Sequence, residues 1–205
     1  MSITRSLTVA TAAVCGLVLG ASPAAAEVEP GGWTQVLPLP TPNLQERGCG
    51  VITANVFELT CSTNSGDQRA EYRYPTYTNG THQFEGRFRV ESIGGSRISL
   101  KQTFRESPNA GSFFLLSVEN GGRLYSVHGG DTVAPTGTAA VGTTVRVNTV
   151  HQVGVAHRTY INGSLAHTDT TSVPGSYYDK LGAYRTASGQ GPVKVTWGGV
   201  KMWTK

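Results

Sequence analysis

The sequence predicts an all-β protein, an antiparallel sandwich or barrel folded as a single domain. Of the 205 residues, 26 are Gly, 10 are Pro and only 15% are charged, a balance typical of a loop-rich globular domain. Thr, Val, Ser, Tyr and Phe dominate the body of the chain, whereas the long side chains that favour helices are scarce. From Val51 onward, alternating runs are broken by Gly, Pro and Asn at intervals of roughly 8 to 15 residues.

The N-terminal segment has the features of a secretory signal peptide, residues 1–26. Arg5 precedes an apolar run that starts near Val9, and the small residues that follow end at Ala26, where we expect cleavage. The mature chain, residues 27–205, then forms the single domain and is expected to be secreted and extracellular. It contains no second apolar stretch near the roughly 20 residues that cross a bilayer, so we expect no membrane association.

Removal of the signal peptide changes the charge and the cysteine count. The formal net charge of +4 falls to +3 because Arg5 is the one charged residue lost, and so small an excess serves solubility more often than binding. Cys15 is also removed, and in an oxidising compartment the remaining Cys49 and Cys61 most simply form one disulfide. We read this pair as a structural staple rather than a catalytic or metal-binding thiol.

The expected elements follow in order along the mature chain. Residues 30–42 are rich in Pro and Gly and predict an arm rather than a helix or a central strand. The run His82–Val90 alternates apolar and polar side chains, as a strand with one face in a core does. Tyr160–Leu165 carries an Asn-Gly pair typical of a type I′ hairpin, and Val193–Trp203 predicts a final strand.

Several function classes lack their usual signatures. The chain has no Gly-x-x-x-x-Gly-Lys-Ser/Thr phosphate loop, no dinucleotide fingerprint and no His-Glu-x-x-His zinc motif. We therefore expect no cofactor, no metal and no nucleic-acid partner.

Two short motifs place polar side chains on one face of a predicted strand. In the first, a period of two points Arg69, Glu71 and Arg73 the same way, so that two guanidinium groups flank a carboxylate. In the second, Gln102 and Phe104 share a face. Taken alone, the first motif is also typical of a solvated strand face, and the second carries almost no functional information.

A third motif runs from Tyr178 to Tyr184. Tyr178, Lys180, Gly182 and Tyr184 line one side of the predicted strand, and the residues between them line the other. A cation close to a phenol lowers the pKa of that phenol from about 10, which suits acid–base chemistry. The ordinary alternative is a half-buried strand with tyrosines at the rim of a sheet.

Together the three motifs resemble polysaccharide lyase family 7, the alginate lyases. That family carries Arg-Ser/Thr-Glu-Leu-Arg, then Gln-Ile/Val-His, then Tyr-Phe-Lys-Ala-Gly-Val/Ile-Tyr-Asn-Gln on strands of a β-jelly roll. The second motif here keeps Gln102 but has Phe104 where the family has its catalytic His. The resemblance spans most of the mature chain and implies a β-jelly roll, a concanavalin-like antiparallel sandwich. The residues that match the first and third motifs are Arg69, Glu71, Arg73, Tyr178, Lys180, Gly182 and Tyr184.

The resemblance implies a secreted lyase that cleaves a 4-linked polyuronate, alginate or a relative such as glucuronan, by β-elimination. In that reaction a proton leaves C5, negative charge develops on the C6 carboxylate and the glycosidic oxygen departs. Arg69 and Gln102 would neutralise the carboxylate, and Tyr184 would transfer the proton. The residues implied to bind substrate around them are Glu71, Arg73, Lys180, Tyr178 and Arg185.

The phenylalanine in the second motif leaves the proton relay incomplete. Phe104 cannot accept or donate a proton, so either Tyr184 performs both transfers or another residue replaces the missing imidazole. The candidates are His128, in a Gly-rich turn, and His82, on a predicted strand. His82, like His151 and His157, lies on a predicted strand, where satisfied core or edge histidines are common, and His167 follows the hairpin.

Two other functions compete with the lyase. A catalytically silent carbohydrate-binding protein would hold the same carboxylates through Arg69 and Gln102, but the detailed match around Tyr184 favours the enzyme. A glycoside hydrolase needs two carboxylates about 5 to 9 Å apart, and the Glu-x-Asp-x-x-Glu motif that would supply them is missing. We expect an acidic polysaccharide as partner and a monomeric protein.

Overall fold

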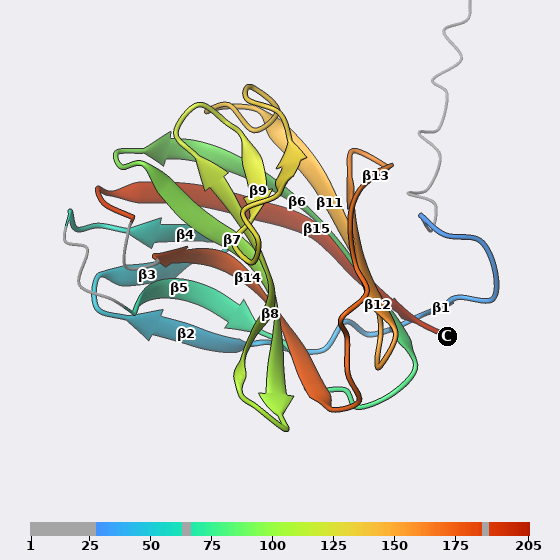
Figure 1. Ribbon diagram of the computed structural model, residues 1–205. Coiled ribbons are helices and arrows are strands. Elements are labelled where there is room, and N and C mark those ends of the chain that lie inside the picture. Colours follow the sequence, from blue (N-terminus) through green and yellow to red (C-terminus); the bar gives the residue numbers. More distant parts are fainter. Residues whose placement is uncertain (1–27, 63–66, 186–188) are drawn as a thin grey trace, which may run out of the picture.

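The computed structural model describes residues 28–62, 67–185 and 189–205. All regular structure in these ranges is strand, and two antiparallel sheets pack face to face (Figure 1). The prediction of an all-β antiparallel sandwich is therefore confirmed. The expected signal peptide, residues 1–26, lies outside the described residues. Over the described ranges, the chain forms no helix that could cross a membrane.

One layer is an eight-stranded sheet. Its strands, in order across the sheet, are β13 (Ser164–Asp169), β12 (Ala156–Ile161), β11 (Thr144–Gln152), β6 (Thr81–Ile93), β15 (Val193–Thr204), β4 (Val56–Leu59) and β3 (Gly50–Thr53), with β1 (Thr34–Gln35) paired to β15. Strand β15 matches the predicted final strand. Asn162 and Gly163 both have positive φ, 53° and 91°, and join β12 to β13 as the predicted hairpin.

The other layer is a seven-stranded sheet. Its strands, in order across the sheet, are β10 (Thr132–Ala134), β9 (Leu124–Ser126), β8 (Gly111–Glu119), β7 (Arg97–Ser107), β14 (Ser176–Arg185), β5 (Gln68–Arg73) and β2 (Asn43–Arg47). The three sequence motifs lie on β5, β7 and β14, with β14 hydrogen-bonded to both of the others. Segments that are far apart in the sequence therefore become direct neighbours in this sheet.

The core fills the space between the two sheets. On β6, Phe84, Phe88 and Val90 are buried in it, whereas Arg87 and Arg89 are exposed, which is the alternation predicted for this run. The residues that β7 and β14 contribute to the same core are Ile98, Leu100, Leu181 and Ala183. Side chains that alternate with these on β14 consequently point to the outer face of the sheet.

A buried polar cluster lies on the inner side of β7 and β14. The Lys101 ammonium donates to Asp179 Oδ1 at 2.5 Å, and the Thr103 hydroxyl donates to the same oxygen at 2.9 Å. The Thr103 hydroxyl also lies 3.1 Å from His157 Nε2. Removing one partner from a buried ion pair is costly, so this cluster fixes β7 against β14 directly behind the motif residues.

The proline-rich arm and the disulfide lie at the start of the described chain. Pro38, Pro40 and Pro42 occupy the connection between β1 and β2, outside both strands, as the composition predicts. The disulfide between Cys49 and Cys61 is formed, with the two Cα atoms 5.8 Å apart, which confirms the predicted pairing. It closes the loop that contains the β3–β4 hairpin.

Candidate active site

The three sequence motifs meet on the outer face of the seven-stranded sheet. In the strand register Tyr184 is paired with Arg69, and Lys180 lies between Arg73 on one side and Gln102 on the other. Directly paired residues of antiparallel strands point to the same face. The side chains that the motifs supply therefore form one strip along β14, on the side opposite to the core.

Glu71 is the centre of this strip. Its carboxylate is only 2% exposed and accepts hydrogen bonds from Gln102 Nε2 at 2.5 Å and from Lys180 Nζ at 3.3 Å, while Arg69 Nη1 lies 3.9 Å away. Burial raises the pKa of Glu71, with the charges of Lys180 and Arg69 acting in the opposite direction. Burial likewise lowers the pKa of Lys180, opposed by Glu71. We call these four residues the Glu71 cluster.

The proposed proton-transfer residue lies at one end of the Glu71 cluster. The Arg69 guanidinium carbon is 5.0 Å from the centroid of the Tyr184 ring, and Tyr184 is half-buried rather than packed into the core. Arg69 also donates to Asp67, which accepts a second hydrogen bond from Arg47. An open cavity of about 320 Å³ beside Arg69 is lined by Arg47 and Gln45, among others. The structure thus brings a phenol and a guanidinium together beside accessible space.

Gly182 shapes the backbone between Lys180 and Tyr184. Its φ of +144° disfavours other residues, and a Cβ at this position would lie 2.2 Å from the carbonyl oxygen of Ala70. The pairing of β14 with β7 shifts register between Leu181 and Tyr184, as at a β-bulge. Such bulges re-aim side chains, and here the bulge sets the direction of Tyr184 relative to the Glu71 cluster.

An aromatic stack occupies the other end of the strip. Phe104 is paired with Tyr178, and their rings stack with centroids 5.0 Å apart and an interplanar angle of 15°. The Arg73 guanidinium lies 3.9 Å from the Tyr178 centroid and donates to Glu106 at 2.8 Å. Phe104, which stands where the family has its histidine, is therefore part of a surface of aromatic and cationic side chains.

His128 is placed near this aromatic end. It follows β9, is exposed, and its Nε2 lies 2.9 Å from Ser112 Oγ. Ser112 is paired directly with Phe104, so its side chain shares the outer face of the sheet. His128 is thus the histidine candidate that reaches this face.

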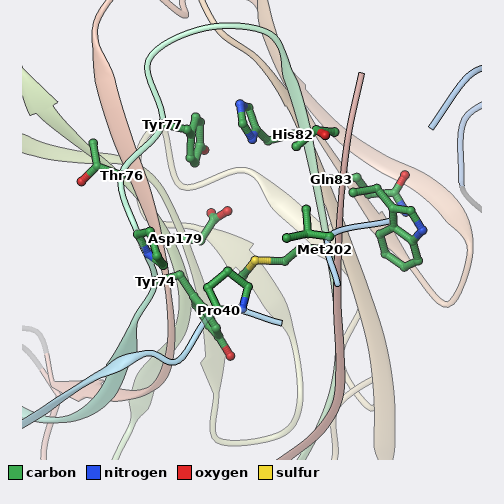
Figure 2. A pocket seen from close by; sticks show the side chains of 12 residues that line it. Pro40, Tyr74, Thr76, Tyr77, His82, Gln83, Asp179 and Met202 are labelled. Carbon is green, nitrogen blue, oxygen red and sulfur yellow. The ribbon is translucent and has the colours of Figure 1, made fainter. Parts of the chain in front are cut away.

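His82 lies in a different part of the molecule. It stacks on Tyr77, with ring centroids 3.9 Å apart, and its Nε2 is 2.7 Å from the carbonyl oxygen of Asn79. Figure 2 shows both rings with Asp179 and Met202 around a pocket. The volume of this pocket is about 180 Å³. Asp179 belongs to the inner side of β14, so the sheet separates this cavity from the strip. The expectation that His82 could replace the missing imidazole is corrected on this ground.

Arg185 also departs from its expected role. Its side chain is 1% exposed and donates to the backbone carbonyls of Cys61, at 2.9 Å, and Gly191. It alternates with Tyr184 along β14 and therefore points away from the strip. Arg185 fastens the end of β14 to the disulfide loop instead of contacting substrate.

Sequence reasoning missed the contribution of β2. Its residues Asn43, Gln45 and Arg47 are paired with the three charged residues of β5 and share their face. Gln45 Oε1 is buried and accepts no hydrogen bond within the described residues. The alternation Asn-Leu-Gln-Glu-Arg was a signal for this strand, but its pairing with β5 joins distant parts of the sequence.

The groups on the strip support charge neutralisation and proton transfer. Guanidinium, ammonium and amide groups surround a carboxyl and a phenol, which are the types that acid–base and electrostatic catalysis use. Within the ranges that the structure describes, no three His, Cys, Asp or Glu side chains form a group that could hold a metal ion.

Comparison with known proteins identifies the fold through structure and not through sequence. No protein-family model and no curated protein matches the chain. Among solved structures, an alginate lyase of polysaccharide lyase family 7 matches with a TM-score of 0.60 and 18% identity, over 84% of this chain and 94% of that one. An alginate lyase from a Corynebacterium species matches with a TM-score of 0.57 and 20% identity, over 75% and 79%.

A third match is to an alginate lyase solved in complex with dimannuronate. Its TM-score is 0.56 at 8% identity, covering 72% of this chain and 73% of that one. At these levels of identity the likeness concerns the fold. The two-sheet sandwich described above is thus the β-jelly roll of these alginate lyases, as the sequence motifs implied.

Proposed function

We propose that the protein is a secreted polysaccharide lyase that cleaves a 4-linked polyuronate, alginate or a glucuronan-like polymer, by β-elimination. The observation that carries the proposal is the meeting of Arg69, Gln102 and Tyr184 on one outward face. Glu71 contacts Arg69 and Gln102 there, and the Arg69 guanidinium lies beside the Tyr184 ring. The shared fold with alginate lyases, one of them solved with dimannuronate, supports the same substrate class.

The proposed role of the Glu71 cluster is to receive the uronate carboxylate. Arg69 presents a guanidinium fork that matches a carboxylate, and Gln102 adds a neutral donor. Because charge on the C6 carboxylate grows as the C5 proton leaves, donors aimed at it stabilise the transition state more than the ground state. Glu71 holds the Gln102 amide and the Lys180 ammonium in place before substrate arrives.

We assign both proton transfers to Tyr184. Its phenolate would remove the C5 proton, and the resulting phenol would protonate the departing glycosidic oxygen on the same face of the sugar. The Arg69 guanidinium, 5.0 Å from the ring centroid, places the phenol next to a group proposed to receive the C6 carboxylate. Tyr178, at the aromatic end, is six residues away along β14, roughly 20 Å in an extended strand. His128 contacts Ser112 near this aromatic end. We therefore place His128 beside a different sugar unit of the bound polymer from the one at Tyr184.

The test is the ultraviolet absorbance of the unsaturated product formed from a panel of polyuronates. The mature protein should release product from at least one polymer, and Tyr184→Phe should abolish the signal while polymer binding persists. Tyr72→Phe is the matched control, because the Tyr72 hydroxyl donates to the carbonyl of Ala54, away from the strip. Binding of a polyuronate by the unmodified protein with no absorbance on any polymer would reject the lyase in favour of a silent carbohydrate-binding protein.

A further inference from the structure

Two arginines face each other on the outer face of the eight-stranded sheet, on the side of the sandwich opposite to the Glu71 cluster. Arg87 of β6 and Arg146 of β11 are direct partners in the strand register. Like charges directly opposite on antiparallel strands destabilise a sheet. An anion bound next to both guanidinium groups would offset this repulsion.

No carboxylate of the described residues compensates these two charges. Neither Arg87 nor Arg146 forms an ion pair within the described ranges, in contrast to Arg89, which lies 3.1 Å from Glu91. Glu85 is on the same face of β6, but it is fully buried and accepts a hydrogen bond from Asn148 at 3.0 Å. The two guanidinium groups are therefore left to solvent or to a ligand.

Two glycines make room for these guanidinium groups. Gly163 has a φ of +91°, and a Cβ there would lie 2.6 Å from Arg146 Nη2. Gly199 has a φ of +62°, and a Cβ there would lie 3.2 Å from Arg87 Nη1. Each arginine head thus rests against the backbone of a neighbouring turn or bulge, which limits its freedom and directs it over the sheet.

The surface around the pair is hollowed. A shallow cavity of about 280 Å³ is lined by Arg87, Thr144, Arg146 and Asn162. A second one, of about 360 Å³, shares Arg87 and Thr144 and continues past Arg89. The two together form an elongated depression with guanidinium, hydroxyl and amide groups, the set that binds a carboxylate next to sugar hydroxyls.

We propose that this depression, the Arg87–Arg146 site, binds carboxylate groups of an acidic polysaccharide. The inference rests on the proposed function for its choice of polymer. A polyuronate presents a carboxylate on every sugar and so suits a pair of uncompensated arginines better than an isolated anion does. Since the site lies on the opposite layer from Tyr184, it would hold the polymer close to the enzyme without taking part in cleavage.

The experiment is affinity electrophoresis in gels that contain a polyuronate or a neutral glucan. We expect Arg87→Gln/Arg146→Gln to weaken binding of the polyuronate about tenfold, because exposed charge pairs contribute up to about a factor of five each. Lys194→Gln/Lys205→Gln removes the same charge elsewhere on the protein and should retain full binding. Neither double variant should change the rate of cleavage of a short oligosaccharide that occupies the Glu71 cluster alone.

Three results would overturn the inference. One is unchanged retardation of Arg87→Gln/Arg146→Gln, and another is an equal loss of retardation in Lys194→Gln/Lys205→Gln. The third is competition in which inorganic sulfate displaces the polymer better than monomeric uronate does, since the site would then be a general oxyanion site. The electrophoresis is made in the Tyr184→Phe background and needs no turnover, whereas the cleavage rate is compared with Tyr184 intact. A failure of the proposed lyase activity therefore leaves this test intact.

Discussion

The two outer faces of the sandwich differ in whether their cationic side chains have carboxylate partners. On the seven-stranded sheet, Lys180 and Arg69 surround the buried carboxylate of Glu71, so the cations have partners inside the protein. On the eight-stranded sheet, Arg87 and Arg146 face each other with no carboxylate partner in the described residues. The comparison teaches that partners inside the protein fix the charged groups of the Glu71 cluster in place, whereas the arginine pair has no such partner among the described residues and can meet a ligand.

The largest expected effect is on catalytic activity, which substitutions on the two faces should change very differently. Arg69→Ala should lower kcat/KM on a polyuronate oligosaccharide about 100- to 1,000-fold, because it removes a donor from the charge that develops in the transition state. Arg146→Ala should leave the same parameter unchanged. Steady-state kinetics by ultraviolet absorbance measures both, and a similar loss in the two variants would break the comparison.

The second effect is on stability. Glu71→Ala leaves the Lys180 ammonium and the Gln102 amide without their buried partner, and it should cost about 3 kcal/mol in the free energy of unfolding. Arg87→Ala removes an exposed charge and should cost nothing measurable. Urea denaturation of the two variants provides the numbers. Equal stabilities would show that Glu71 is not the structural centre of the strip.

The third effect is on stability at low pH. Acid should lower the free energy of unfolding through His151, which is buried. Burial lowers the pKa of His151 from 6.5 to about 4, while its ring lies 3.0 Å from the Tyr77 hydroxyl and 2.8 Å from that of Ser172. Because the folded-state pKa is depressed, the stabilisation is complete above pH 6.5 and is lost as the pH falls toward 4. The loss should be on the order of 2 to 3 kcal/mol.

The measurement is thermal unfolding of wild type and His151→Gln across this pH range. The variant lacks the titrating group, so its stability should fall less steeply with acid. Parallel curves for the two proteins would contradict the assignment. Polymer binding at the Arg87–Arg146 site should persist as long as the protein remains folded.

The smallest effect concerns the arginine pair itself. Arg146→Gln relieves the repulsion with Arg87 and should raise the free energy of unfolding by about 0.5 kcal/mol at low salt. The gain should shrink as salt is added, because Arg87 is exposed and Arg146 is partly exposed, and salt screens such charges. Calorimetry at two salt concentrations tests this. A loss of stability instead would mean that the pair already has a compensating partner.

The sequence predicted the fold because strand periodicity is local. Alternation over His82–Val90 and over the third motif placed the buried and the outward side chains correctly, and two cysteines left one possible pairing. The same alternation predicts that Arg185 points to the opposite side of β14 from Tyr184, although the family resemblance implied a contact with substrate there.

The sequence does not predict which distant segments pair as neighbouring strands. Nothing local shows that Gln45 stands opposite Glu71, or that Arg87 stands opposite Arg146, because both pairings join separate parts of the chain. The same holds for His128, whose approach to Ser112 depends on how β8 and β9 are connected. These residues became visible only in the folded sheets.

The most direct test of the proposed function is a crystal structure of Tyr184→Phe with a bound polyuronate oligosaccharide. We expect one uronate carboxylate within hydrogen-bond distance of Arg69 and Gln102, with C5 of that sugar facing the ring at position 184. A sugar bound only over Phe104 and Tyr178, or no sugar on this face of the sheet, would contradict it.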